Sequence, residues 1–396
     1  MQPPSTIAPP LSFLYTDIGR GHPFYLDGII EAIARQGGGP TFEKRTVFEL
    51  SRGLSGMAWR GVRQAYLKGS SGGVLGRFYA SVRRNNDYNH TGLIGKLLGR
   101  DLIRFAREHV GPIVVAHPLL VGLLGRHARV IYQHGELTAP DEALVAGAEM
   151  VIVPNDAVAK RFLSAGYRKE QVFVSGLCVE PAIATQAETC FEQRMKRLRG
   201  YEPLTGLFLS SGAEPKAHLR HIVSSAASCF GEGFRCIALA KAGGRLEQVI
   251  KNDWAARGLI YHPLTSDGLW PKDLGRAALV TFRSRKEENE LAARIFPEID
   301  FLVAPSHERT NWAMGLGLPT FLLAPAVGPF APLNRKLLVT NGVARVLDSD
   351  LTASRLADTV YALRTSGELE IMARAGWGRP ISGFERIASF LAERFS

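Results

Sequence analysis

The chain has 396 residues, 46% of them hydrophobic and 21% charged, and a formal net charge of +11. This composition is typical of a globular protein with two domains, and it excludes a disordered or fibrous chain. The sequence has no uncharged apolar run of about 18 residues and no basic start followed by a long apolar stretch, so neither a transmembrane helix nor a signal peptide is expected.

The first predicted elements are a strand at 11–16 and a helix at 24–35, joined by the turn Asp17-Ile-Gly-Arg-Gly-His22. Gly19 and Gly21 allow a tight turn that directs backbone N–H groups toward the edge of a sheet, a place suited to anions and polar ligands. Histidine is the side chain best suited to proton transfer near neutral pH. We therefore interpret His22 as a candidate general base, with capping of its helix as the alternative.

Positive charge is concentrated between residues 51 and 107. Eleven Lys and Arg residues face only two acidic residues there, which gives this segment +9 of the total +11. Aromatic residues such as Trp59, Tyr66 and Tyr79 alternate with the basic ones, a pattern that favours contact with an anionic membrane surface. The alternative is a pair of solvated surface helices. No recognisable nucleic-acid module accompanies the charge, so binding of nucleic acid is not expected.

The remaining sequence alternates short apolar strands with amphipathic helices, which predicts parallel sheets covered on both faces. In the first half, strands are expected at 44–48, 112–116, 129–133, 150–153 and 172–175, and helices at 93–109, 140–146 and 156–165. In the second half, strands are expected at 205–210, 235–240, 258–261, 278–282, 300–304 and 320–323, and helices at 216–229, 245–257, 354–365 and 381–395. A polar helix at 186–198 is interpreted as the connection between the halves.

Two loops of the second half are suited to a diphosphate. The backbone N–H groups of Ser210, Ser211 and Gly212 follow a strand, and the hydroxyls of Ser306 and Thr310 lie near the start of a helix. Arg283 follows another strand and is a candidate contact for a base or phosphate, with a solvated surface position as the alternative.

Two further histidines, an Asp-Ser-Asp segment and four cysteines are also considered as candidate ligand-binding or metal-binding residues. His117 and His134 follow strands and could face a ligand, and the alternative for each is a structural role. Asp348-Ser-Asp350 precedes a helix and is interpreted as its N-cap and not as a metal site. Cys178, Cys190, Cys229 and Cys236 lack metal-binding spacing, which indicates reduced buried thiols in a cytoplasmic protein.

The order and spacing of these motifs resemble a GT-B glycosyltransferase, in particular the family 28 branch that contains monogalactosyldiacylglycerol synthase and the bacterial peptidoglycan N-acetylglucosaminyltransferase. Residues 17–22 resemble the Gly-x-Gly-His loop of that branch, and 59–79 its acceptor and membrane-contact region. Residues 115–118 and 130–134 fall at its later N-domain motifs, and 301–319 resemble its donor-site strand, loop and helix. The resemblance covers residues 11 to 347.

The resemblance extends the candidate sites. It places Asp17, Gly19, Gly21, His117 and His134 on the acceptor side of a cleft. It adds Asn311, Trp312 and Asn334 to the donor-binding residues Ser210, Ser211, Gly212, Arg283, Ser306 and Thr310. Trp312 stands where the family has a Glu that binds the ribose, and it could stack on a base or fill the core.

The resemblance also implies the architecture, an α/β fold of GT-B type with two Rossmann-like domains whose parallel sheets face a central cleft. The acceptor-side domain would comprise residues 1–182, with a basic membrane-facing segment at 51–107. A linker at 183–204 would precede the donor domain at 205–375. The C-terminal helix within 376–396 would pack back on the first domain.

The expected function is transfer of a sugar from a nucleotide-sugar donor, UDP-linked, onto a lipid or lipid-linked acceptor with inversion. The protein would be cytoplasmic and peripheral at the inner face of the membrane, with no cofactor and no metal. Two alternatives remain, a nucleotide-sugar epimerase or hydrolase on the same fold and a non-catalytic GT-B-like binding protein.

Overall fold

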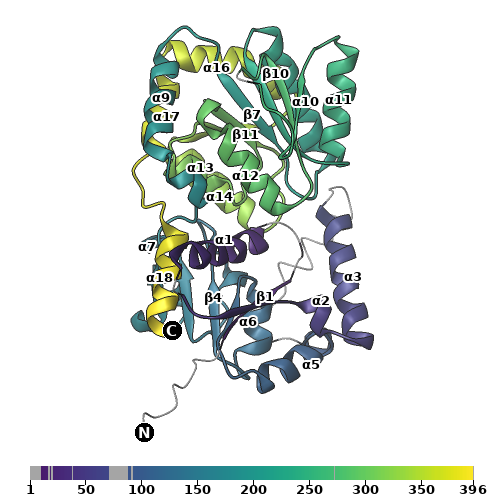
Figure 1. The fold of residues 1–396 in the computed structure, drawn as a ribbon, viewed down its shortest axis with the longest axis vertical. Helices are drawn as coiled ribbons and strands as arrows, with labels where there is room; N and C mark the ends of the chain where they lie inside the picture. The colour runs from purple at the N-terminus through teal and green to yellow at the C-terminus, as the bar shows by residue number, and fades with distance from the viewer. Residues whose placement is uncertain are drawn as a thin grey trace. The chain divides into compact units, whose positions relative to one another are not determined.

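The computed structural model describes residues 10–395 apart from 17, 19, 20, 38, 71–87, 91 and 272, and for 66–70 it describes the backbone alone. The described chain divides into two compact units (Figure 1). The N-terminal unit contains residues up to 69, residues 88–181 and residues from 382 onward, and the C-terminal unit contains residues 182–381. Each unit is built on a parallel sheet, so the predicted α/β class is confirmed.

In the N-terminal unit, the described strands form one six-stranded sheet in the order β2-β1-β3-β4-β5-β6. Its strands are β1 (Leu11–Tyr15), β2 (Phe42–Thr46), β3 (Ile113–Val115), β4 (Val130–Gln133), β5 (Met150–Val153) and β6 (Val172–Val174). Its helices are α1 (Gly21–Gln36), α2 (Val47–Leu50), α3 (Gly53–Ser70), α5 (Leu93–Glu108), α6 (Pro118–Leu124), α7 (Asp156–Ser164) and α18 (Gly383–Phe395), with 3₁₀ turns η1 (Asp141–Ala143) and η2 (Lys169–Gln171). The helix predicted at 140–146 is therefore only the turn η1, and Gly147, with a φ of 103°, follows it.

Both faces of this sheet are covered, because successive strand side chains point to opposite sides. In β3, Ile113 and Val115 join a core cluster with residues of α5, α6 and α7. Val114 joins a second cluster, which contains residues of α1 and α18. The apolar runs that predicted buried parallel strands are explained by this burial on two sides.

The last helix of the chain, α18, packs against α1 (Figure 1). A Cβ atom on Gly28 of α1 would lie 2.2 Å from the ring of Phe384, so glycine is what lets the two helices approach. The rings of Phe24 and Phe384 lie 5.5 Å apart, and Gln36 Nε2 donates to the carbonyl of Glu385 at 3.1 Å. The helix that begins next to His22 is thus supported by the C-terminus of the chain.

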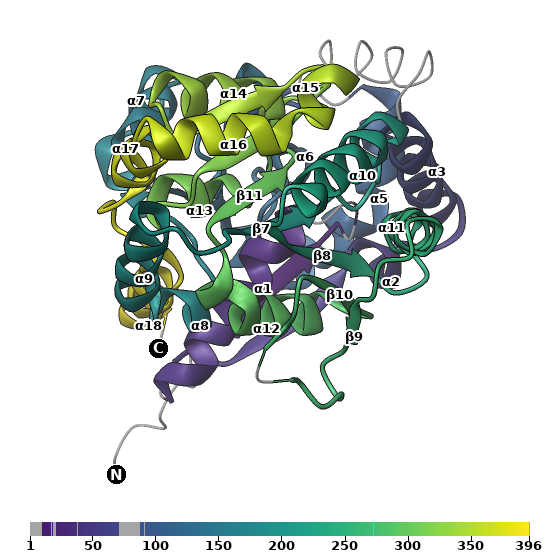
Figure 2. The ribbon, with the colours of Figure 1, turned by 90° about the horizontal axis from the view of Figure 1, so that it is seen from above.

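In the C-terminal unit, the described strands form a seven-stranded parallel sheet in the order β13-β12-β11-β7-β8-β10-β9. Its strands are β7 (Thr205–Leu209), β8 (Arg235–Lys241), β9 (His262–Leu264), β10 (Ala277–Phe282), β11 (Phe301–Ala304), β12 (Thr320–Leu323) and β13 (Ala344–Leu347). Its helices are α8 (Pro181–Ala184), α9 (Ala187–Arg199), α10 (Lys216–Gly231), α11 (Arg245–Ala256), α12 (Arg285–Ile295), α13 (Thr310–Gly315), α14 (Phe330–Thr340), α15 (Asp350–Ser354), α16 (Leu356–Thr365) and α17 (Glu368–Gly376), with the 3₁₀ turn η3 (Phe296–Glu298). Figure 2 shows α10 and α12 on opposite sides of this sheet.

The segment expected as a linker, 183–204, contains α9, which packs into the core of the C-terminal unit. Phe191, Met195 and Leu198 of α9 belong to that core, and the ring of Phe191 stacks on Trp377 at 4.3 Å. The strand expected at 258–261 lies instead at β9, and β13 was not anticipated.

The cysteines are confirmed as buried free thiols. None of the helices that the structure describes is both long enough and apolar enough to span a bilayer.

Candidate functional site

Each sheet has a topological switch point, where consecutive strands begin to add on the other side of the first strand. In the N-terminal unit it lies between β1 and β3, and in the C-terminal unit between β7 and β11. Ligands of open α/β sheets bind at such points, outside the carboxyl ends of the strands. The candidate residues that follow these four strands are therefore the ones to test for a site.

Two histidines meet at the switch point of the N-terminal unit. His22 is the second residue of α1, after β1, and His117 follows β3 as the N-cap of α6. Their ring centroids are 4.6 Å apart at an interplanar angle of 59°, and both side chains are half-buried. The ring of Tyr88, which is buried, lies 6.1 Å from that of His117. The structure thus brings together two candidates that are 95 residues apart in the sequence.

The backbone fixes the tautomer of His117. The N–H of Leu119 donates to His117 Nδ1 at 3.1 Å, so in the neutral ring the proton resides on Nε2. His117 therefore presents an N–H donor on the ring edge away from its own helix. Thr16 follows β1 directly, and its buried hydroxyl has no hydrogen-bond partner among the described residues. An unsatisfied buried hydroxyl at a switch point is a group that a polar ligand can satisfy.

His134 occupies a different place from this pair. It is buried, its Nε2 bonds the carbonyl of Thr138 at 3.0 Å, and its Nδ1 contacts the hydroxyl of Tyr132 at 3.2 Å. A carbonyl only accepts, so Nε2 carries the proton and both ring nitrogens are used within the fold. Burial lowers the pKa of His134 to about 4, which keeps the ring neutral at pH 7. Of its two alternatives, the structural role fits these contacts.

The turn before His22 is described only in part. Gly21 begins α1. Asp17 and Gly19 lie outside the described residues, so their interpretation stays a prediction.

In the C-terminal unit, the loop after β7 is held in place by Glu214. This residue adopts the left-handed region with a φ of 44°, which is costly for a side chain other than glycine. Its carboxylate accepts from the N–H of Arg245 at 2.7 Å and of Leu246 at 3.3 Å, at the start of α11. This bonding fixes the loop that carries Ser210, Ser211 and Gly212.

Two hydroxyls at this switch point are buried without a hydrogen-bond partner among the described residues. Ser210 Oγ follows β7 and Thr310 Oγ1 follows β11, and neither has a hydrogen-bond partner among the described residues. Thr310 is only 3% exposed. The strand register pairs Val303 with Phe208, and its continuation by two residues places Pro305 beside Ser210. The loops after β7 and β11 therefore lie side by side, and each carries a hydroxyl that can still form a hydrogen bond.

Ser306 and Asn334 differ from those two residues. The hydroxyl of Ser306 donates to the carbonyl of Ala331 at 2.8 Å, and Asn334 Nδ2 donates to the carbonyl of Ser306 at 3.2 Å. Both side chains are buried. These bonds join the loop after β11 to α14 and give the Ser306 hydroxyl a structural partner, while its role as a donor to a ligand stays a prediction.

Trp312 is a buried side chain of the C-terminal unit. It is 1% exposed, meets the ring of Phe296 edge-on at 5.3 Å, and lies under the Arg309 guanidinium at 4.0 Å. Arg309 is itself buried and pairs with Glu288 at 3.3 Å. Asn311, the neighbouring candidate, is also buried. Of the two alternatives for Trp312, filling the core fits these contacts, and its place among the donor-binding residues stays a prediction.

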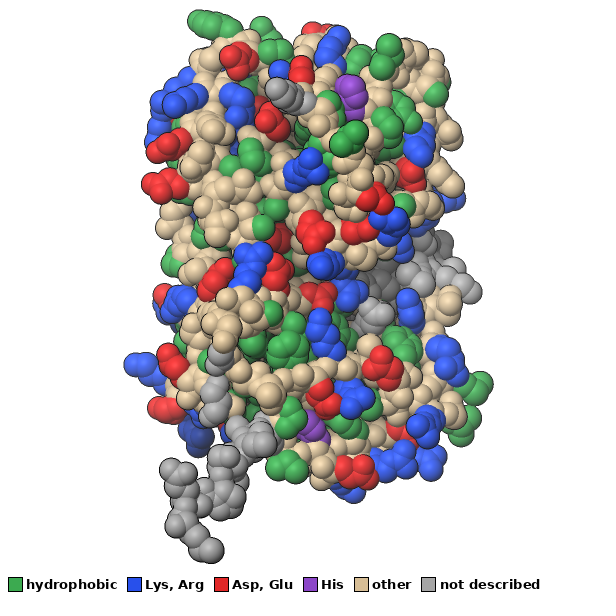
Figure 3. Space-filling model, viewed as in Figure 1, with side chains coloured by type: hydrophobic (Ala, Val, Ile, Leu, Met, Phe, Trp, Pro, Cys, Tyr) green, Lys and Arg blue, Asp and Glu red, His purple; other side chains and the backbone are tan. Residues whose placement is uncertain are grey.

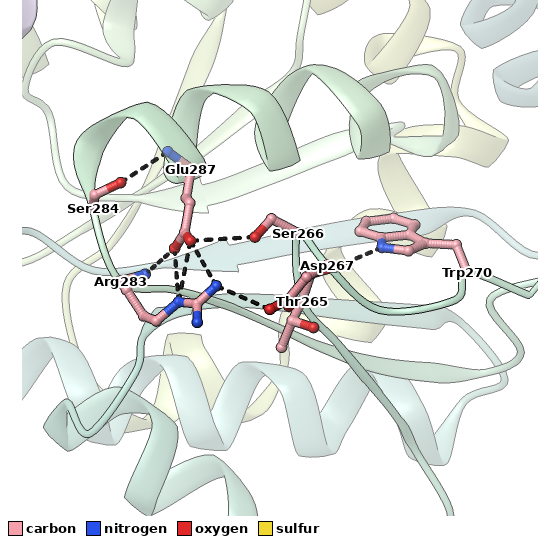
Figure 4. Close-up of polar contacts among 7 residues, drawn as sticks. All are labelled: Thr265, Ser266, Asp267, Trp270, Arg283, Ser284 and Glu287. Atoms are coloured by element: carbon pink, nitrogen blue, oxygen red, sulfur yellow. Dashed lines mark hydrogen bonds and ion pairs between the residues drawn. The ribbon is translucent and has the colours of Figure 1, made fainter.

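Arg283 is exposed at the end of β10 but its guanidinium is already engaged. It bonds Glu287 at 2.8 Å and Asp267 at 3.2 Å, and its backbone N–H also donates to Glu287 (Figure 4). Ser266 donates to the same Glu287 carboxylate at 3.2 Å. These contacts tie the loop after β9 to the start of α12, so Arg283 organises a surface loop in this structure.

Two histidines near the C-terminal switch point were missed by sequence reasoning. His218, on α10, is 0% exposed, and its Nε2 bonds the carbonyl of Pro325 at 2.8 Å. His307 lies in the loop between β11 and α13 and is half-buried. A signal existed for His307, which stands directly between two candidates in the sequence, but none marked His218, which lies inside a helix.

The Asp-Ser-Asp segment forms a helix cap. Ser349 accepts from the N–H of Thr352 and begins α15. In the described part of the chain, no group of three or more His, Cys, Asp or Glu residues is placed to hold a metal ion.

No family model matches the sequence, and no curated protein matches it. Solved structures do match the fold. MnaA of Staphylococcus aureus, in a co-structure with UDP, is 12% identical with a TM-score of 0.53, over 98% of this chain and 94% of that one. The UDP-GlcNAc 2-epimerase of Methanocaldococcus jannaschii, in complex with UDP-GlcNAc and UDP, is 13% identical with a TM-score of 0.52, over 97% and 99%.

These likenesses extend over nearly the whole chain and show its fold. Together with the two parallel sheets, they identify an α/β protein of GT-B type with two Rossmann-like units. At this level of identity they show no shared activity. The resemblance to the family 28 branch therefore stays a prediction.

Proposed function

We propose that the protein is a glycosyltransferase that moves a sugar from a UDP-linked donor, with inversion, onto a hydroxyl of a lipid or lipid-linked acceptor. The observation that carries the proposal is the pair His22 and His117 at the switch point of the N-terminal unit. The fold adds support, because the similar solved structures named above contain UDP or UDP-GlcNAc.

His22 is the general base of this proposal. The acceptor oxygen forms a bond to the anomeric carbon as the bond from that carbon to the diphosphate oxygen breaks, and the acceptor proton passes to His22. General base catalysis of this kind contributes roughly 10²- to 10⁴-fold to the rate. The Nε2–H of His117, fixed by the bond from Leu119, orients either the His22 ring or the acceptor.

The C-terminal unit is proposed to hold the leaving UDP. The hydroxyls of Ser210 and Thr310 are already desolvated, so the phosphate oxygens give them partners without a new cost of burial. The fixed loop around Gly212 adds backbone N–H groups. The proposal includes no metal and no further cofactor.

A surface of α3 and α5 is proposed to contact the membrane. Leu54, Met57, Leu93, Ile94 and Leu97 are exposed there, Leu93 by 85%. The indole N–H of Trp59 donates to the carbonyl of Leu98 at 3.1 Å, which joins the two helices. Exposed basic residues lie on the same helices, and Figure 3 shows hydrophobic and basic side chains together in this region. Apolar and basic groups combined suit an anionic lipid surface.

Flotation with vesicles that contain anionic lipid tests this surface. Replacing Ile94 by Glu should reduce vesicle binding of the full chain several-fold, because it removes apolar area and adds a repelled charge. Ile260, which is 90% exposed in the C-terminal unit, supplies the matched Ile→Glu control. Equal binding by both variants would contradict the assignment. The location proposed with it is cytoplasmic and peripheral at the inner face of the membrane.

The function itself is tested by titration followed by turnover. The purified chain is titrated calorimetrically with UDP, GDP, dTDP and ADP without added metal, and UDP is expected to bind. It is then incubated with UDP-linked sugars and lipid extract, and the products are examined for a glycolipid and its anomeric configuration. A glycolipid of retained configuration would overturn the inverting mechanism.

An epimerase is the second candidate, because the similar structures include a UDP-GlcNAc 2-epimerase. It predicts conversion of UDP-GlcNAc into its 2-epimer without any acceptor, which NMR of the nucleotide sugar detects. Binding of UDP with neither conversion nor transfer would favour the non-catalytic alternative.

A further inference from the structure

The histidines His218 and His307 face the same edge of the C-terminal sheet from different elements. His218 belongs to the helix after β7, yet its ring reaches the carbonyl of Pro325 after β12. The strand order is β12-β11-β7, so this bond passes over the carboxyl end of β11, from which His307 follows. Beyond the last register pair, Ala304 with Leu322, the chain turns, because the N–H of His307 donates to the carbonyl of Pro305 at 3.0 Å, so His307 lies just past the end of β11. Both histidines therefore belong to the segments that follow β7 and β11, as Ser210 and Thr310 do.

Both rings are neutral at pH 7. Burial lowers the pKa of His218 to about 4, although its bond to Pro325 acts in the opposite direction, and the nearby His307 lowers it further. Burial also lowers the pKa of His307, against the attraction of Glu308. Because Pro325 can only accept, the proton of His218 lies on Nε2. Its buried Nδ1 is then a lone pair with no partner among the described residues.

Several charged groups of the neighbouring elements already have partners. On α10, His221 bonds Asp350 of α15 at 3.2 Å, and Arg220 reaches the same carboxylate at 3.4 Å. On the loop after β11, Glu308 acts on His307. The buried Arg309 is paired with Glu288 of α12. The two histidines are neutral groups of this edge that can gain a proton when an anion arrives.

We propose that binding of the nucleotide diphosphate at Ser210 and Thr310 is coupled to uptake of one proton by the pair His218 and His307. This rests on the nucleotide site of the proposed function. An anion in that site favours the charged imidazole by direct attraction in a medium of low dielectric. Protonation turns the unused lone pair of His218, or the ring of His307, into a donor toward the phosphate.

Calorimetry in several buffers measures how many protons the protein takes up when it binds a nucleotide sugar. The full chain is titrated at pH 7 with UDP-GlcNAc and UDP-glucose, whose diphosphate diesters do not titrate near neutral pH, in PIPES, HEPES and Tris. The dependence of the binding enthalpy on the ionisation enthalpy of the buffer gives the net uptake. We expect uptake approaching one proton and an affinity that falls up to tenfold for each unit of pH above neutrality.

Three variants assign the proton. His307→Asn and His218→Gln should still bind the nucleotide sugar but with reduced uptake and a flatter pH dependence, and Gln at 218 retains an N–H for Pro325. His221→Gln, on the same helix, should keep the full uptake.

Binding with no uptake in the parent chain overturns the coupling and leaves the nucleotide site standing. Uptake that survives when His218→Gln and His307→Asn are combined in one chain overturns the assignment to this pair. No binding of any UDP compound overturns the nucleotide site and the coupling together.

Discussion

The two switch points use the same geometry of parallel strands but offer different chemical groups. In the N-terminal unit, His22 and His117 are half-buried and lie ring to ring at 4.6 Å. In the C-terminal unit, the groups that follow β7 and β11 are the buried hydroxyls of Ser210 and Thr310. Accessible imidazoles favour proton transfer, whereas desolvated hydroxyls favour the binding of an anion. The same fold position can therefore serve different roles, according to which side chains follow the strands and how deeply their polar atoms are buried.

A substitution at His22 tests most directly whether the two switch points have separate roles. His22→Ala should lower kcat by roughly 10²- to 10⁴-fold, because the acceptor hydroxyl loses its base. The affinity for UDP should stay unchanged, since the proposed nucleotide site lies in the other unit. Steady-state transfer assays and calorimetry with UDP measure the two effects. Equal loss of turnover and UDP binding would show that the two sites are not separate in function.

Acid should destabilise both units through one buried histidine in each, His134 and His218. Burial lowers the pKa of each ring to about 4 in the folded state, so the unfolded chain binds more protons below its ordinary value of 6.5. The free energy of unfolding should therefore fall as pH drops from 6.5 to 4, by about 3 kcal/mol for each ring, and then level off. Urea denaturation at a series of pH values measures this loss.

The variant His134→Gln should flatten the pH dependence of stability in that range. The exposed His262, replaced by Gln, is the control and should leave it unchanged. Stability that rises as the parent chain is acidified from pH 6.5 would contradict the buried neutral state of these rings.

The hydroxyls of Thr310 and Ser306 allow a test of ligand binding against structural bonding in neighbouring positions of the chain. Thr310→Val removes a hydroxyl without a described partner, so stability should be unchanged while UDP binds about five- to tenfold more weakly. Ser306→Ala removes the donor to Ala331 and should cost about 1–2 kcal/mol of stability. Thermal unfolding and UDP titration of both variants distinguish the two. Unaltered UDP affinity in the Thr310 variant would remove that hydroxyl from the proposed site.

The alternation of strands and helices was readable because strands buried on two faces leave uninterrupted apolar runs. The bounds of strands at the edge of a sheet were harder to predict from the sequence. In the run from Leu259 to Leu264 the paired residues are the last three, which periodicity alone does not select, and β13 carries the exposed Arg345.

Side-chain roles in the candidate site depended on tertiary packing. Ser306 and Thr310 are similar residues four positions apart, and only the contact with α14 makes one structural. Trp312 could not be assigned from sequence, because the ring that meets it comes from Phe296, sixteen residues away. His218 carried no motif at all. The fold followed from local patterns, whereas the site depended on which loops the sheet order brings together.

The smallest expected effect is at Gly212, in the loop that would approach the diphosphate. A Cβ on Gly212 would meet no described atom within 4 Å, and its φ is not in the left-handed region, so Gly212→Ala should leave stability unchanged or raise it by about 0.5 kcal/mol. If phosphate oxygens contact this backbone, the added methyl group should weaken UDP binding a few-fold. Gly231, at the end of α10, is equally open and gives the matched control. Because both glycines are unconstrained by the fold itself, a difference in UDP affinity between the two alanine variants would have to come from the ligand, and no difference would mean that the diphosphate does not rest on this loop.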